Sequence, residues 1–276
     1  MSRIEVAYLG PEGTYSHLVA EKRYGRGAKL VPCPSVVDVF AYAAEKPSRH
    51  AIVPIENSSG GTIYETVDML LSGRYNLSIE EGLDLHVRLA LLGMKGERIR
   101  ILYSHFAQFI HCDSWIRRHL PQVERREVPS TAIAAREAAT VRHAAAIASR
   151  RAAKIYHLNL LNYPLEEDVP NVTQFLALTR HCRAMRDARK TTFAVHLPNR
   201  PGSLCSFLEP FRDQKVNLSR IISRPIPGRP SEYAFFVDVA GIPKQKAVKT
   251  AMVAAADTGA HLRVIGSYPV RTFTAD

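Results

Sequence analysis

The chain has 276 residues, of which 46% are hydrophobic and 23% are charged, and this composition excludes a disordered protein. The length is sufficient for two domains, each with its own hydrophobic core. No stretch approaches the 18 consecutive apolar residues of a transmembrane helix, and the first residues lack the pattern of a signal peptide. We therefore expect a cytoplasmic protein without a membrane partner.

The net charge is +11, but the basic residues lie in short separate stretches such as 117–119 and 180–190. None of these stretches is interleaved with aromatic residues, so we predict solvated helix faces and a linker rather than a nucleic-acid partner. A second interpretation of the positive charge is a weak electrostatic attraction of carboxylate substrates. The cysteines show no CxxC pair and the histidines no ligand spacing, so we expect neither disulfides nor a metal site. The cysteines are Cys33, Cys112, Cys182 and Cys205.

Short apolar strands alternate with helical patterns from the first residues onward. We predict strands over residues 4–9, 28–32 and 50–54, a loop over 56–61, and helices over 15–24, 36–45 and 62–71. This alternation predicts an α/β domain with a mostly parallel sheet.

A long alternating segment, residues 76–92, indicates strands that leave one lobe and enter another. A second α/β series follows, with strands at 98–103, 123–128, 144–148 and 172–178, helices at 106–119, 130–140 and 150–156, and an irregular stretch at 159–170. Two lobes joined by crossing segments should enclose a cleft, where such sheets bind ligands.

After the predicted linker, residues 180–190, the pattern changes to the order βαββαβ, which is typical of a ferredoxin-like domain. We predict strands at 192–197, 216–224, 233–239 and 261–265, helices at 203–212 and 244–256, and a hairpin loop at 225–230.

Three polar segments are candidates for a binding site: residues 10–16 (GPEGTYS), 55–62 (IENSSGGT) and 171–175 (NVTQF). The first two join a strand to a helix and offer hydroxyls, an amide and backbone N–H groups to an anion. Each also has a structural reading, as a tight turn, a set of helix caps or an edge strand. In the third segment, alternation places Thr173 and Phe175 on one side and Gln174 on the other.

Together, the three segments resemble the prephenate dehydratase family. That family carries GPxGTxS near its start, then PIENSxxG before a helix with Thr-x-Asp-x-Leu, an AAIAS segment and a late Thr-Arg-Phe. The chain has GPEGTYS at 10–16, PIENSSG at 54–60, TVDML at 66–70 and AAIAS at 145–149. The C-terminal part is similar to an ACT module, with PGSL at 201–204, VNL at 216–218 and SRP at 223–225.

The resemblance implies an α/β fold: a two-lobed, periplasmic-binding-protein-like catalytic domain (1–182) followed by a βαββαβ ferredoxin-like ACT regulatory domain (190–270). It implies a carbon-oxygen lyase of phenylalanine biosynthesis that converts prephenate to phenylpyruvate without a metal or organic cofactor. It further implies phenylalanine as the effector and a homodimer or homotetramer.

The resemblance also assigns roles to residues. Thr173 is the expected catalytic residue, which protonates or stabilises the leaving hydroxyl by a hydrogen bond. The expected substrate-binding residues are Thr14, Ser16, Asn57, Ser58, Gly60, Ser104, His105, Ser149, Asn171, Gln174 and Phe175. The expected effector-binding residues are Gly202, Ser203, Leu204, Asn217, Leu218, Ile222, Ser223 and Arg224.

Two departures from the family pattern leave alternatives open. Gln174 replaces the Arg of Thr-Arg-Phe, which removes a permanent charge and donors. Ile222 replaces the Glu of Glu-Ser-Arg-Pro, which puts phenylalanine control in doubt. The chain could be a divergent dehydratase, a non-aromatising prephenate decarboxylase, or a non-catalytic sensor of amino or keto acids. Retention of Thr173 favours the dehydratase, because a decarboxylase has no leaving hydroxyl to assist.

Overall fold

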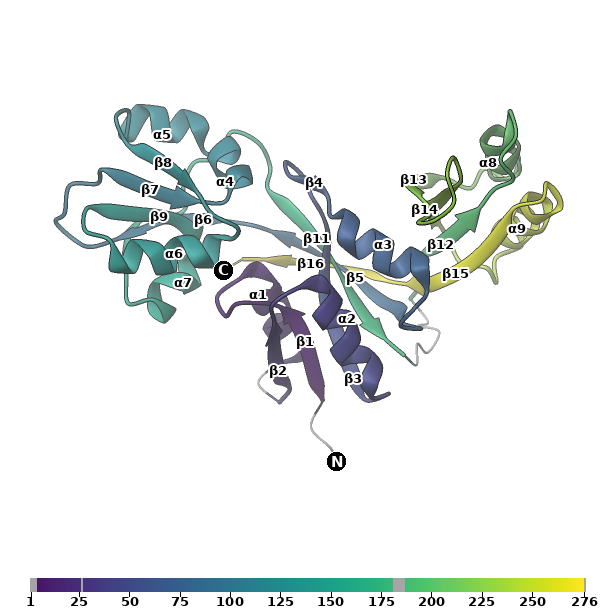
Figure 1. Cartoon of the computed structure of the whole chain (residues 1–276), viewed down its shortest axis with the longest axis horizontal. Coiled ribbons are helices and arrows are strands. Elements are labelled where there is room, and N and C mark those ends of the chain that lie inside the picture. The colour runs from purple at the N-terminus through teal and green to yellow at the C-terminus, as the bar shows by residue number, and fades with distance from the viewer. Residues whose placement is uncertain (1–3, 26, 181–186, 276) are drawn as a thin grey trace.

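The computed structural model describes residues 4–25, 27–180 and 187–275. Three β-sheets follow one another along an elongated molecule (Figure 1). Two sheets with their helices form the lobes of the N-terminal part, and the third belongs to the C-terminal domain. The predicted α/β class is confirmed, and so is the βαββαβ order at the C-terminal end.

The first lobe contains a seven-stranded sheet of order β16-β5-β11-β3-β1-β2, with β4 paired to β3. Strands β1, β2 and β3 are parallel, whereas β11 runs antiparallel between β3 and β5. Residues such as Ala7 and Ile52 on its central strands are fully buried. The elements are β1 (Glu5–Leu9), α1 (Tyr15–Tyr24), β2 (Lys29–Cys33), α2 (Val36–Glu45), β3 (Arg49–Asn57), β4 (Gly61–Thr62), α3 (Tyr64–Ser72), β5 (Ser78–His86), β11 (Val172–Thr179) and β16 (Val270–Thr274).

The second lobe contains a five-stranded sheet of order β10-β6-β9-β7-β8. Strands β7, β8 and β9 are parallel, β6 runs antiparallel to β9, and the edge strand β10 runs antiparallel to β6. The elements are β6 (Leu89–Gly93), β7 (Ile101–Ser104), α4 (Phe106–His111), α5 (Asp113–His119), β8 (Glu124–Glu127), α6 (Thr131–Thr140), β9 (Ala144–Ser149), α7 (Arg150–Ile155) and β10 (Asn159–Asn162).

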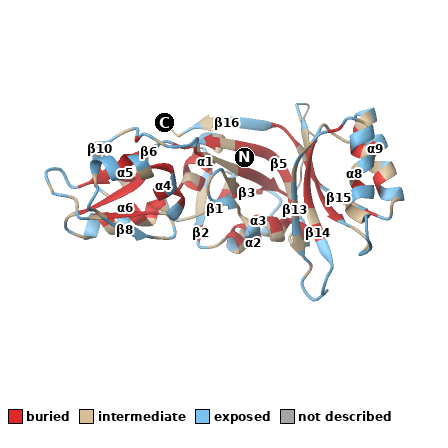
Figure 2. Ribbon diagram, turned by 90° about the horizontal axis from the view of Figure 1, so that it is seen from above, coloured by how far each residue is buried: buried red, intermediate tan, exposed pale blue. Residues whose placement is uncertain are grey.

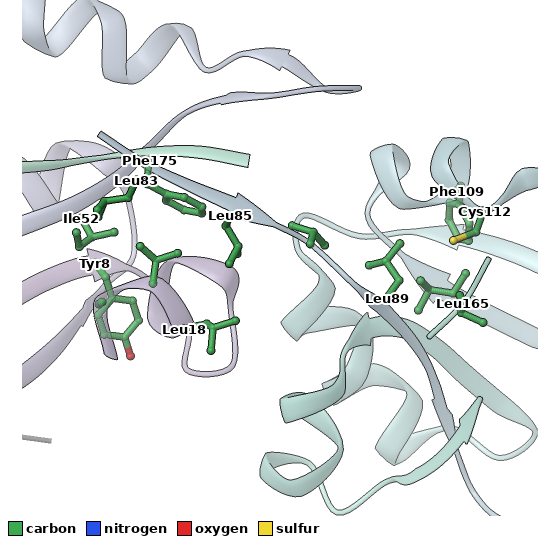
Figure 3. Packing of buried hydrophobic residues seen from close by; sticks show 14 of the residues in the cluster. Tyr8, Leu18, Ile52, Leu83, Leu85, Leu89, Phe109, Cys112, Leu165 and Phe175 are labelled. Carbon is green, nitrogen blue, oxygen red and sulfur yellow. The ribbon is translucent and has the colours of Figure 1, made fainter. Parts of the chain in front are cut away.

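The lobes are joined where β5 continues into β6, as the long alternating segment predicted. Val87 in this crossing donates its backbone N–H to the Asn171 carbonyl at 2.8 Å, so the outgoing and returning chains are held together. One hydrophobic cluster extends across the crossing, with Leu83 and Phe175 in the first lobe and Leu89 and Phe109 in the second (Figure 3). This shared packing fixes how the lobes face each other.

The C-terminal domain has a four-stranded sheet of order β13-β14-β12-β15. Helices α8 and α9 pack on one face around Phe207 and Phe211, and the other face meets the first lobe through buried Phe236 and Tyr268 (Figure 2). Gly266 permits the close approach, because a Cβ there would lie 2.3 Å from the Ile79 carbonyl oxygen. The elements are β12 (Lys190–His196), α8 (Ser203–Asp213), β13 (Leu218–Pro225), β14 (Tyr233–Ala240), α9 (Lys246–Asp257) and β15 (His261–Tyr268).

Several local predictions were wrong. The segment predicted as a loop over 56–61 begins inside β3 and ends in β4, because Asn57 pairs with both Thr173 and Gly61. The helix predicted over 106–119 is two helices that meet at Cys112, whose φ and ψ of −116° and 19° are not helical. Strand β10 lies in the stretch predicted to be irregular. The predicted linker, 180–190, lies for the most part outside the described residues.

The last strand, β16, returns from the C-terminal domain to the first lobe and pairs in parallel with β5. Arg271 on this strand donates to the Glu81 carboxylate, which is fully buried, at 2.6 Å. Such a long-range pairing leaves no local pattern in the sequence, so the strand was not predicted.

Candidate active site

A cavity of about 840 Å³ lies between the lobes and is lined from both of them. It contains Thr173 and part of the predicted substrate-binding set. Those lining residues are Thr14, Ser16, Asn57, Gly60, His105 and Phe175. The three polar segments of the sequence thus converge on one cavity, although only some residues of each line it.

Asn57 and Thr173 face each other at the ends of neighbouring strands. The Asn57 side-chain oxygen accepts from the backbone N–H groups of Ser59 and Gly60, at 3.1 and 2.8 Å, and this fixes the orientation of the amide. Its NH2 group therefore points to the Thr173 hydroxyl, to which it donates at 2.9 Å. The hydroxyl accepts this bond and donates none in the described part of the chain, so its own proton is available to a molecule in the cavity.

The loop from β1 to α1 also lines the cavity, through residues such as Gly10 and Thr14. Thr14 caps α1 by accepting from the His17 backbone N–H at 3.3 Å, and its hydroxyl donates to the Leu9 and Pro11 carbonyls at 3.0 Å. His17 accepts from the Gly13 N–H at 3.1 Å and is buried, which lowers the pKa of its imidazole. Thr14 therefore acts mainly by holding the shape of the loop.

The electrostatics of the cavity favour an anion. The N-terminal ends of α1 and α6, both ten residues long, reach it from opposite lobes through Ser16 and Thr131. Among the described lining residues, Arg136 is the single Lys or Arg, and no Asp or Glu is present. Arg136 is 59% exposed and pairs with Glu137 at 3.1 Å, a weak surface contact that a carboxylate ligand can replace.

His105 lines the cavity at the start of α4. Its Nδ1 accepts from the Ala107 N–H at 3.3 Å, and burial lowers the pKa of the ring. Both observations indicate a neutral imidazole at neutral pH, so His105 contributes a hydrogen-bonding group rather than a charge.

Four predicted substrate-binding residues lie outside the lining and make structural contacts. Ser58 ties the loop after β3 to the start of β11, donating to the Pro170 carbonyl at 2.9 Å and accepting from the Val172 N–H. Ser104 donates to Ile147 at 2.8 Å inside the second lobe, and Ser149 donates to Gly13 at 3.2 Å across the two lobes. Asn171 accepts a hydrogen bond from the Asn57 side chain at 3.2 Å and so helps to orient Asn57.

Gln174 is also outside the cavity, on the opposite face of β11 from Thr173. Its side-chain oxygen accepts a hydrogen bond from the Arg220 guanidinium of the C-terminal domain. The departure from the family pattern at this position therefore does not alter the cavity wall.

Five of the eight predicted effector residues lie in two different surroundings. Gly202 precedes α8 and Ser203 and Leu204 begin it, and the Ser203 hydroxyl is buried without a hydrogen-bond partner among the described residues. Ile222 packs against the first lobe, and Arg224 makes a bidentate ion pair with Asp68 of α3, at 2.6 and 2.7 Å. These two residues are thus engaged by the first lobe in this structure.

Sequence reasoning missed the contribution of α6, namely Ser130, Thr131 and Arg136. The available signal was a Ser-Thr pair at a helix start after a strand, but residues 130–140 were predicted only as a helix. Ser130 is the cap of this helix, since it accepts from the Ile133 N–H at 3.2 Å. The described residues contain no group of three or more His, Cys, Asp or Glu side chains placed to bind a metal, and no helix long and apolar enough to cross a membrane.

A family model described as "Prephenate dehydratase" matches residues 6–183, and one described as "ACT domain" matches residues 191–257. The chain belongs to the prephenate dehydratase family. A bifunctional chorismate mutase/prephenate dehydratase of Aquifex aeolicus is 33% identical over 267 residues, which cover 97% of this chain and 74% of the relative. An Arabidopsis thaliana relative named arogenate dehydratase/prephenate dehydratase 2 is 35% identical, with 98% and 74% covered.

Solved structures agree with the family. Prephenate dehydratase from Arthrobacter aurescens, described as a complex with L-Phe, superimposes with a TM-score of 0.85 and 29% identity over 96% of this chain and 90% of that one. The two-lobed, periplasmic-binding-protein-like fold with an ACT domain is therefore confirmed. GqqA, described as a quorum quenching acylase, has a TM-score of 0.86 at 24% identity, covering 97% and 98% of the two chains, and shows a shared fold alone.

Proposed function

We propose that this chain is a prephenate dehydratase, which converts prephenate to phenylpyruvate, CO2 and water in phenylalanine biosynthesis. The observation that carries the proposal is the pair of Asn57 and Thr173, a hydroxyl held by an amide donor at 2.9 Å in a cavity that suits an anion. The family that the chain belongs to supports the same reaction.

In this reaction the ring carboxylate leaves as CO2 and its bonding electron pair moves into the ring. The C–O bond at the opposite carbon breaks with its electron pair, and the hydroxyl takes up one proton to leave as water. Thr173 is placed to donate a hydrogen bond to that hydroxyl as it departs. Since aromatisation drives the reaction, orientation of the substrate and stabilisation of the leaving group are the main tasks of the protein.

Prephenate is favoured over arogenate as the substrate. Arogenate carries an ammonium group where prephenate carries a keto group, and the described lining contains no Asp or Glu to receive it. Arg136 would instead repel an ammonium group and attract the carboxylates that both substrates share. The α1 and α6 termini add to this preference for a doubly charged anion.

The remaining assignments concern regulation and assembly. We propose that residues 1–182 carry catalysis and that residues 190–270 bind phenylalanine, to which the buried Ser203 hydroxyl at the start of α8 offers a hydrogen bond. The edge strand β13 exposes Ile221, 45% accessible, and favours pairing of ACT domains in a homo-oligomer. We also propose a cytoplasmic location.

The test is to mix the purified chain with prephenate and follow product by absorbance. An aromatic keto acid together with CO2 supports the dehydratase. A non-aromatic product with CO2 release replaces it with a decarboxylase, and saturable binding without turnover replaces it with a sensor. Arogenate, assayed in parallel, should react more slowly because of its ammonium group.

A further inference from the structure

The back of the catalytic strand pair is held by an arginine from the ACT domain. Arg220 on β13 donates to the Glu56 carboxylate at 3.1 and 2.5 Å, to the Asp238 carboxylate at 3.0 Å, and to the Gln174 side-chain oxygen. Its side chain is only 11% exposed, and Asp238 is fully buried. Arg220 thus joins two residues of the first lobe to its own domain in a largely buried network.

The two partners in the first lobe are the sequence neighbours of the site residues. Glu56 precedes Asn57 on β3, and Gln174 follows Thr173 on β11. In the ladder Thr173 is opposite Asn57 and Gln174 is opposite Glu56. Because side chains alternate along a strand, one pair faces the cavity while the other faces the ACT domain.

The backbone ladder is irregular at this point. Phe175 is opposite Pro54, so that Ile55 is an extra residue in β3, and Pro54 has no N–H to donate. The main chain therefore fixes the relation between β3 and β11 less firmly here than in a regular ladder. A side-chain contact that binds both strands can supply the missing constraint.

We propose that Arg220 is a positioning residue for catalysis: by holding Glu56 and Gln174 it keeps Asn57 and Thr173 in register, so that the site is complete only when the ACT domain is docked. This inference rests on the proposed function. It also accounts for the loss of the family arginine at 174, since that position meets the ACT domain and Arg220 supplies a guanidinium between Glu56 and Asp238.

The test compares two arginines of the ACT domain that both contact the first lobe. Arg220→Ala should lower kcat for prephenate by about tenfold or more and change KM by less than about threefold, because a misplaced catalytic group slows chemistry more than binding. Arg263→Ala is the matched control. Arg263 donates to the Leu70 and Leu71 carbonyls at 2.7 and 2.9 Å, at the end of α3 and away from the cavity lining. The kcat of the Arg263→Ala variant should therefore stay within about twofold of the wild-type value.

Arg220→Lys should recover part of kcat, because an ammonium group can reach one carboxylate but not all three partners. If Arg220→Ala does not fold, as judged by circular dichroism, Gln174→Ala and Glu56→Gln replace it, because both leave the pair of Arg220 and Asp238 intact. Each should lower kcat by about three- to fivefold with KM unchanged.

The inference is overturned if folded Arg220→Ala, or both replacement variants, keep kcat within about twofold of the wild type. It is also overturned if Arg263→Ala lowers kcat as much as Arg220→Ala does. Absence of turnover in the wild-type chain would instead contradict the proposed function. If the wild-type chain turns over prephenate and the Arg220→Ala variant is equally active, this inference alone is contradicted.

Discussion

The two faces of the strand pair β3 and β11 show how one ladder serves two domains. On one face Asn57 and Thr173 form a hydrogen-bonded pair at 2.9 Å in the cavity between the lobes. On the other, Glu56 and Gln174 meet Arg220 of the ACT domain. The comparison teaches that adjacent residues of one motif can have different partners. A substitution at position 174 changes the contact with the ACT domain, whereas a substitution at position 173 changes the cavity.

The largest effect is expected on the cavity face. Thr173→Ala should lower kcat by about 100-fold or more, because the leaving hydroxyl loses its hydrogen-bond donor. Steady-state kinetics with prephenate, together with a binding measurement on an unreacted analogue, separates the chemical step from binding. Thr173→Ser keeps the hydroxyl and should retain most of kcat. An Ala variant with a normal kcat removes Thr173 from the mechanism.

A smaller effect is expected at the rim of the cavity. Arg136→Ala should raise KM by about fivefold with little change in kcat, because an exposed cation adds binding but does not touch the leaving group. The matched control is Arg142→Ala, since Arg142 is exposed and lies outside the cavity lining. Equal KM values for the two variants would show that the cavity binds its anion without Arg136.

The ACT domain should respond to its effector. Phenylalanine at about 100 times its dissociation constant adds about 2.7 kcal/mol to stability, which corresponds to a rise in Tm of about 5 °C for a chain of this size. Differential scanning fluorimetry with phenylalanine and with leucine as a control measures the shift. Identical melting curves with and without phenylalanine would show that Ile222, in place of the family Glu, has altered the effector.

The smallest effect concerns pH. Burial lowers the pKa of His17, and protonation of its Nδ1 removes the bond from Gly13 that shapes the 10–16 loop. Since the folded-state pKa lies below the ordinary value of 6.5, this contribution to stability is present above pH 6.5 and declines as pH falls through 6.5 toward the lowered value. His17→Gln should therefore flatten the decline of Tm between pH 7 and pH 5. A decline that is equally steep in the variant would assign it to other histidines whose pKa is lowered by burial, such as His105 and His111.

Much of the fold could be predicted because local patterns and architecture agree. Helices such as Tyr15–Tyr24 and Val36–Glu45 match their predicted ranges, and the Thr14 and Ser35 side chains cap their first turns. Strand β16 could not be predicted, because its pairing with β5 depends on a buried carboxylate, Glu81, nearly two hundred residues away. The break at Cys112 likewise reflects tertiary packing rather than a helix-breaking residue.

The candidate site was also predictable only as far as local sequence segments mark it. Segments rich in hydroxyls and amides marked the cavity, but sequence alone could not distinguish a serine that lines it, such as Ser16, from one that joins the lobes, such as Ser149. Arg136 could not be predicted from the family resemblance, because the motifs that carry this resemblance lie outside its helix. The contact of Gln174 with Arg220 could not be predicted, because it depends on how the ACT domain docks on the first lobe.

The most direct test of the two faces compares alanine variants of the neighbours Thr173 and Gln174. The account predicts that Gln174→Ala lowers kcat by about three- to fivefold and leaves KM for prephenate unchanged, while Thr173→Ala abolishes most turnover. If Gln174→Ala instead raises KM at least as much as Arg136→Ala does, then Gln174 contacts the substrate and the division of this strand into two faces is contradicted.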